Sequence, residues 1–164
     1  MKALAMIGIT LAGLALSAWA GESTTNNNPK EATMPARGTF DVKVSPLPPD
    51  DSAAGPFGRL LLDKRFHGDL DGPSKGQMLA VQTAIEGSGA YVAFEQFTGV
   101  LGGKRGSFML QHRGTMQGGD YKMDVTVVPD SGTDALTGIS GKMTIVIEGK
   151  KHSYDFLYTL PAPR

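Results

Sequence analysis

Residues 91–116 read YVAFEQFTGVLGGKRGSFMLQHRGTM and contain the clearest structural signal in the chain. Apolar and polar side chains alternate along Tyr91–Leu101 and again along Ser107–Met116, which is the period of a β-strand with one buried face. Between these two segments stand Gly102-Gly103-Lys104-Arg105, and glycines of this kind suit a tight turn. We therefore predict a long antiparallel hairpin.

The same period of two recurs on both sides of this hairpin. Short glycine-containing segments separate most of the repeats, and no convincing amphipathic helix is evident. The connection Pro129–Gly141 is longer and is expected to hold one short helical turn. Together with the two strands of the hairpin, six further segments give about eight strands: 40–45, 60–66, 74–85, 121–128, 142–148 and 154–160.

A sheet of eight strands with one apolar face can bury that face in two ways, in a sandwich or by closing on itself. Closure also removes the exposed strand edges on which other chains could pair. Eight strands then leave an interior just wide enough for side chains or one small ligand. The prediction is an all-β fold, a single closed antiparallel β-barrel.

The first 20 residues, MKALAMIGITLAGLALSAWA, have the features of a secretory signal peptide. One early charge, Lys2, precedes an apolar run, and Ala18-Trp19-Ala20 matches a small-residue cleavage site. The run Ala3–Ser17 is shorter than the about 20 apolar residues needed to cross a bilayer. We expect cleavage after Ala20 and a periplasmic or secreted protein without stable membrane insertion; the alternative is an uncleaved anchor.

After this leader, residues 21–36 are rich in Ser, Thr, Asn and Pro and have little to bury, so we predict a flexible linker. Residues 37–160 then form the barrel domain, and 161–164 form a short C-terminal tail. This gives one domain of ordinary size.

Composition excludes several classes of protein. The 164 residues contain no cysteine, which removes disulfide scaffolds, thiolate metal sites and cysteine nucleophiles. The 16 basic side chains balance the 16 acidic ones, so the bulk charge on which most nucleic-acid binding relies is missing. No nucleic-acid partner is expected.

Three segments carry a resemblance to a known family: Leu62–Leu70, Thr98–Met116 and Val127–Thr133. With them, the chain from Arg37 to Leu160 resembles a bacterial family that is described as a domain of unknown function. The resemblance implies a closed barrel similar to that of allene oxide cyclases and plant dirigent proteins. It implies no reaction and carries over no catalytic residue, because a fold by itself does not transfer function.

Charged or titratable side chains on otherwise apolar strand faces are the main candidates for a site. Each of three such side chains lies two residues from an apolar one and so on the same face of its strand: Lys64 after Leu62, Glu95 after Ala93, and His112 after Leu110. If the strands are regular, all three point inward, where charges must pair, shift their pKa values or border water. The set could then bind a polar group or transfer a proton.

Structural alternatives to such a site remain open. Lys64 and Glu95 could form a buried pair that serves packing, or a β-bulge could turn one of them outward. Gln111 faces away from His112 in a regular strand and is kept as a secondary ligand-binding candidate, because a bulge near Gly106 or Gly114 would turn it inward.

Other motifs give weaker signals. Gly72-Pro73-Ser74-Lys75-Gly76 matches the G-x-S-x-G pattern of serine hydrolases, but the strand–elbow–helix context of that motif is missing, and we predict a turn. His67, His112 and His152 are too far apart in sequence for a local metal motif. Here His67 is expected to face outward and His152 to lie at a turn. No metal and no cofactor are predicted.

Three functions remain open on the sequence. The favoured one is a barrel that binds a small, largely apolar ligand with one or two polar contacts. The second is an isomerase or cyclase that uses the same cavity. The third is a structural or assembly protein that acts through its outer surface, with a homo-oligomer as one form.

Overall fold

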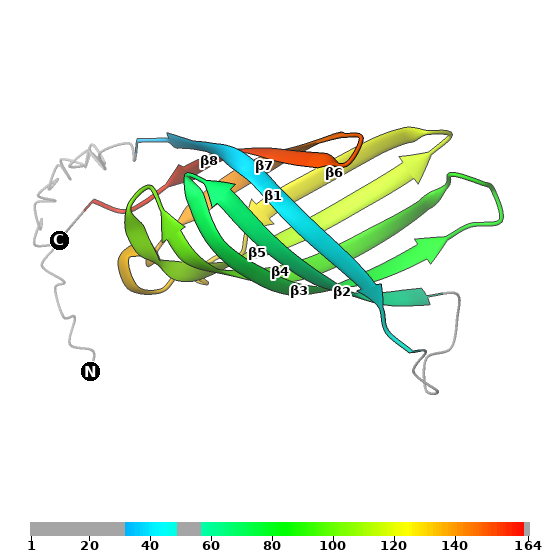
Figure 1. Cartoon of the computed structure of the whole chain (residues 1–164), viewed down its shortest axis with the longest axis horizontal. Helices are drawn as coiled ribbons and strands as arrows, with labels where there is room; N and C mark the ends of the chain where they lie inside the picture. Colours follow the sequence, from blue (N-terminus) through cyan, green and yellow to red (C-terminus); the bar gives the residue numbers. More distant parts are fainter. Residues whose placement is uncertain (1–31, 49–56, 163–164) are drawn as a thin grey trace, which may run out of the picture.

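The structure is a computed structural model that describes residues 32–48 and 57–162 (Figure 1). The expected signal peptide, most of the expected linker and the last two residues of the chain lie outside these ranges. In the described part there are eight strands and one short 3-10 helix: β1 (Met34–Pro46), β2 (Phe57–Gly68), β3 (Leu70–Gln82), β4 (Gly89–Leu101), β5 (Lys104–Gln117), β6 (Asp120–Val127), η1 (Asp134–Leu136), β7 (Ser140–Glu148) and β8 (Lys151–Thr159).

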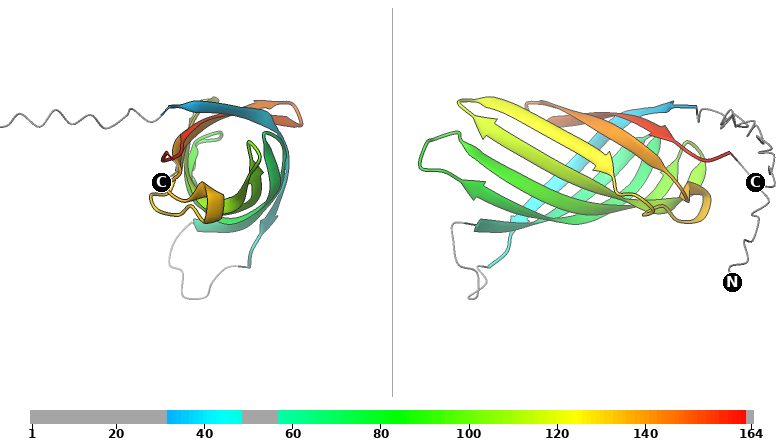
Figure 2. Two further views of the ribbon diagram at one scale, coloured as in Figure 1. Left: turned by 90° about the vertical axis from the view of Figure 1, so that its left-hand side faces the viewer. Right: turned by 180° about the vertical axis from the view of Figure 1, so that it is seen from behind.

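The strands form one closed barrel in which each strand pairs with its neighbours in sequence (Figure 2). All neighbouring pairs are antiparallel, and β1 closes the barrel by pairing with β8 from Met34↔Tyr158 to Phe40↔His152. The predicted all-β closed barrel is therefore confirmed. Its only helical turn in the described residues, η1, lies in the connection where one was expected. No helix in this part of the chain has the length and apolar character of a membrane span.

The barrel starts earlier than the sequence indicates. Strand β1 begins at Met34, so the expected boundary between linker and domain at residue 37 is corrected. The reason is burial of Ala36, which is 1% exposed and pairs with Phe156 of β8. In the sequence, a single small apolar residue between Pro35 and Arg37 does not indicate that a strand has begun.

The segment Gly72–Gly76 is also different from the prediction, because it is part of β3 and not a turn. Pro73 pairs with Arg65 of β2, while the β3–β4 register passes over Gly72 and Pro73, consistent with a proline that has no N–H to donate. The glycines let the next strand come close. A Cβ on Gly76 would clash with the carbonyl oxygen of Phe94 and lie 2.6 Å from the Cβ of Glu95.

One end of the barrel is filled with aromatic side chains. Phe66, Phe97, Phe108 and Phe156 are all 0% exposed, and their ring centroids follow one another at 5.8, 5.2 and 5.7 Å. Leu136 of η1 belongs to the same buried cluster. We call these five side chains the floor of the barrel, because the interior above them, toward the β3–β4, β5–β6 and β7–β8 turns, is not filled in the same way.

We predict that Gly76→Ala destabilises the protein by about 1–3 kcal/mol, because the added methyl group forces β3 and β4 apart. The matched control is Gly58→Ala in β2, where the nearest atom to the new Cβ is 3.9 Å away. Its expected effect is within about 0.5 kcal/mol. Urea unfolding followed by circular dichroism measures both, and equal stability of the two variants would contradict the close approach.

Candidate functional site

Lys64, Glu95 and His112 all face the interior and are in contact with one another. They are 6%, 2% and 3% exposed. The Nζ of Lys64 lies 2.9 Å from Oε1 of Glu95, and Nε2 of His112 lies 2.9 Å from the same oxygen. The inward orientation inferred from strand alternation is thus present in the structure, and the charges are paired rather than isolated.

Ser74 is a fourth member of this cluster. Its Oγ donates a hydrogen bond of 3.1 Å to Oε2 of Glu95, and the residue is 1% exposed. Sequence reasoning missed Ser74 because it stood at the start of the expected strand 74–85, where this strand overlaps the Gly72–Gly76 segment that was predicted to be a turn. A usable signal was present: a strand through Gly72-Pro73-Ser74-Lys75-Gly76 puts Ser74 on one face and Lys75 on the other.

Four adjacent strands, β2 to β5, position the cluster. Lys64 pairs directly with Ser74, Gly76 with Glu95, and Ala93 with His112. The small residue in two of these pairs leaves space for the larger side chain beside it. The cluster therefore follows from antiparallel register, since cross-strand neighbours on one face have Cβ atoms only about 5 Å apart.

The carboxylate of Glu95 accepts three hydrogen bonds, and this decides its ionisation. Burial on its own raises the pKa of Glu95, but the hydrogen bond from His112, the charge of Lys64 and its hydrogen bond act in the opposite direction and are larger together. The resulting pKa is about 2, below the ordinary value of 4.5. Glu95 is consequently an anion at any physiological pH.

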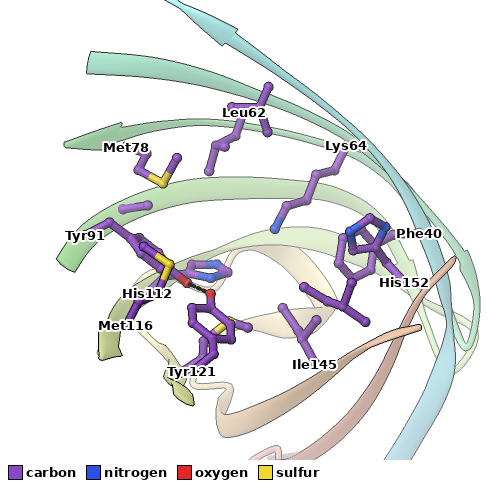
Figure 3. A pocket seen from close by; sticks show the side chains of 14 residues that line it. Phe40, Leu62, Lys64, Met78, Tyr91, His112, Met116, Tyr121, Ile145 and His152 are labelled. Atoms are coloured by element: carbon purple, nitrogen blue, oxygen red, sulfur yellow. Dashed lines mark hydrogen bonds between the residues drawn. The ribbon is translucent and has the colours of Figure 1, made fainter. Parts of the chain in front are cut away.

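Above the cluster the barrel contains a pocket of about 440 Å³ (Figure 3). Lys64 extends from β2 into this space (Figure 3). Glu95, which contacts both Lys64 and His112, is not one of the lining residues. Most of the lining is apolar. The 14 lining residues are Phe40, Val44, Leu62, Lys64, Met78, Tyr91, Ala93, His112, Met116, Tyr121, Met123, Ile145, Ile147 and His152.

Two tyrosines stand together at one side of the pocket. The hydroxyls of Tyr91 and Tyr121 are 2.8 Å apart and hydrogen-bonded, and the rings are stacked at a centroid distance of 6.5 Å (Figure 3). Burial and the hydrogen bond to Tyr121 raise the pKa of Tyr91 well above its usual value. Tyr91 therefore stays neutral and can both donate and accept a hydrogen bond.

Comparison with known proteins identifies the family. The model of the family described as protein of unknown function, DUF3224, matches residues 36–158. The chain belongs to the DUF3224 family. A solved structure of a DUF3224 protein of unknown function from Shewanella oneidensis MR-1 is similar to it, with 43% sequence identity and a TM-score of 0.73. That similarity covers 80% of this chain and 100% of the other. No curated protein matches the chain.

The other candidate residues of this DUF3224 barrel lie apart from the cluster. Gln111 is exposed on the outer face, because β5 pairs there without a bulge, with Phe94 on one side and Thr126 on the other. His67 is on the outer face as expected and lies 3.1 Å from Asp41. Gln111 is therefore not part of the interior site.

His152 differs from its predicted position at a turn. It lies in β8, lines the pocket and packs against the ring of Phe40 at a centroid distance of 5.1 Å. Within residues 32–48 and 57–162, no group of three or more His, Cys, Asp or Glu side chains is arranged to hold a metal ion.

We predict that Glu95→Gln destabilises the protein by about 3–5 kcal/mol at pH 7, because it leaves the charge of Lys64 buried without a partner. Since the pKa of Glu95 is lowered on folding, its stabilising contribution is complete above pH 4.5 and is lost as the pH falls toward 2. As the pH falls from 4.5 toward 2, the free energy of unfolding should therefore decrease less for the variant than for the original protein. Urea unfolding at a series of pH values measures both effects.

The matched control is Asp63→Asn, which removes an ion pair with Lys75 on the outer face, where both side chains are more than half exposed. Such surface pairs contribute about 0–1 kcal/mol. If Glu95→Gln were no more harmful than this control, the hydrogen bonds to the carboxylate would have to be unimportant for folding.

Proposed function

We propose that the protein binds a small, largely apolar molecule inside the barrel. The observation that carries the proposal is the pocket of about 440 Å³ above the buried cluster, lined mainly by aliphatic, aromatic and methionine side chains. Ligand pockets generally have volumes of about 300–1,000 Å³ and an apolar lining with a few polar groups. This pocket has both properties.

The lining is suited to adapt to a guest molecule. Met78, Met116 and Met123 come from three different strands and are each only partly buried. Methionine side chains are flexible and polarisable, so they fill the space around ligands of different outline. Contacts from the strands around the interior favour a ligand that is enclosed rather than one that lies on the outside.

The same geometry gives less support to proton-transfer catalysis. A general base works best with a pKa near the operating pH, whereas the pKa of Glu95 is about 2. Both carboxylate oxygens also accept hydrogen bonds from protein side chains. An isomerase or cyclase that uses Glu95 as its base is therefore the weaker candidate, and ligand binding is the stronger one.

A substitution that fills the pocket tests this proposal. We predict that Ile145→Trp weakens the binding of Nile red, an uncharged fluorescent probe, by at least about tenfold, because the indole occupies the space that an apolar guest needs. Fluorescence titration measures the affinity.

Val146→Trp is the matched control, since Val146 is the next residue in β7 and is 47% exposed on the outer face. It should leave the affinity unchanged. Absence of Nile red binding to the original protein, or an equal loss in both variants, would contradict binding inside the barrel.

We also propose that the protein is exported, on the basis of residues 1–20. Expression of the full chain in a Gram-negative bacterium, followed by fractionation and intact-mass measurement, should give a periplasmic or secreted protein that begins at Gly21. A cytoplasmic protein that retains residues 1–20 would contradict this.

A further inference from the structure

The wall of the pocket presents hydrogen-bond donors and positive charge. Lys64 and His112 line the pocket, while Glu95, their shared acceptor, lies behind them. Among the described residues that line the pocket, none is an aspartate or a glutamate. The lining side chains with polar atoms are Lys64, Tyr91, His112, Tyr121 and His152.

Lys64 has hydrogen-bonding capacity beyond its contact with Glu95. An ammonium group carries three N–H donors and no acceptor. One of them is directed to Oε1 of Glu95, the same oxygen that lies beside Nε2 of His112. Lys64 also lies over the ring of Phe40, at 4.9 Å from the centroid, a contact that fixes its position without using a donor. Glu95 is the acceptor of Lys64 among the residues that the structure describes, so within this part of the chain two N–H groups are left for a molecule in the pocket.

Lys64 and His112 lie at a different depth in the barrel from the methionines and the tyrosine pair of the pocket. His112 lies four residues before Met116 in β5, and Met116 pairs with Tyr121 beside the β5–β6 turn. The start of β2 lies beside the β3–β4 turn, where Phe57 pairs with Val81. Lys64 is two residues further from this start than Leu62 and so lies deeper. Lys64 and His112 are thus deep, next to the floor, and the methionines, most of the aliphatic side chains and the Tyr91–Tyr121 pair are nearer the turns.

An anion suits the deep end better than a cation or a neutral group. A cation would lie beside the ammonium of Lys64, and like charges repel strongly where water is scarce. A neutral acceptor would form ordinary hydrogen bonds. An anionic acceptor forms charge-assisted hydrogen bonds, which are roughly twice as strong.

We propose that the ligand is an amphiphile with one anionic head group, a carboxylate in the simplest case, bound by the free N–H groups of Lys64 beside His112, while its apolar chain extends toward the turns. This inference rests on the proposed function and adds the chemical class of the ligand. Glu95 then acts as a positioning residue, which holds Lys64 and His112 from behind and does not contact the ligand.

Competition with Nile red tests the head group with three compounds of equal chain length: decanoate, 1-decanol and decylammonium. The expected order of displacement is decanoate first, at a concentration at least about tenfold lower than decanol, and decylammonium last. Decanol is the more hydrophobic compound, so a preference for decanoate would have to come from the head group.

A double variant, Lys64→Met with Glu95→Gln, removes both partners of the buried ion pair and so avoids an unpaired charge. With competition measured against the variant's own Nile red affinity, it should lose the preference for decanoate over decanol. The control, Lys75→Met, removes a lysine from the outer face, where Lys75 pairs with Asp63, and should keep the preference.

The outcomes separate the two proposals. If Nile red does not bind the original protein, the proposed function fails. If Nile red binds but decanol competes as well as decanoate, or no decyl compound competes, the function stands and the anionic head group is overturned. An unchanged preference in the double variant would also overturn the assignment to Lys64.

Discussion

Pairing of the first strand with the last is the constraint on which the rest of the structure depends. Without the contacts from Met34 to Phe40 of β1 with β8, the sheet would have an open face, and its inward side chains would meet water. Closure converts an alternating pattern into an enclosed interior. It also determines that the charge of Glu95 is buried, so that the carboxylate requires the three donors that surround it.

The interior is divided into two parts with different physical roles. Four phenylalanines and Leu136 fill one end and remove a large apolar area from water, the main favourable contribution to folding. The other end contains the pocket, whose methionines and Ile145 are only partly buried and whose Ile147 is 50% exposed. The ion cluster lies between them and gives the interior a polar layer at one defined depth.

Sequence reasoning predicted the fold and much of the cluster for the same reason. In a regular strand the side chains alternate strictly, so Lys64, Glu95 and His112 could be assigned to the interior without knowledge of the register. It missed Ser74 because glycine and proline usually indicate turns, whereas here Gly72 and Gly76 serve close strand contact. His152 was misplaced because the glycine and lysines before it indicated a turn, whereas β8 already begins at Lys151. The pocket volume could not be predicted, since it depends on which side chains meet across the barrel.

The division of the interior has a consequence for how such a barrel can change over time. Mutations at Met78 or Ile145 would reshape the pocket while leaving the aromatic contact of Phe66 and Phe97 untouched. The shape of the pocket and the packing of the floor thus depend on separate positions, and distant sites of this kind contribute to stability nearly independently. Under the proposed function, substitutions of pocket residues would change which ligand is bound while the protein stays folded.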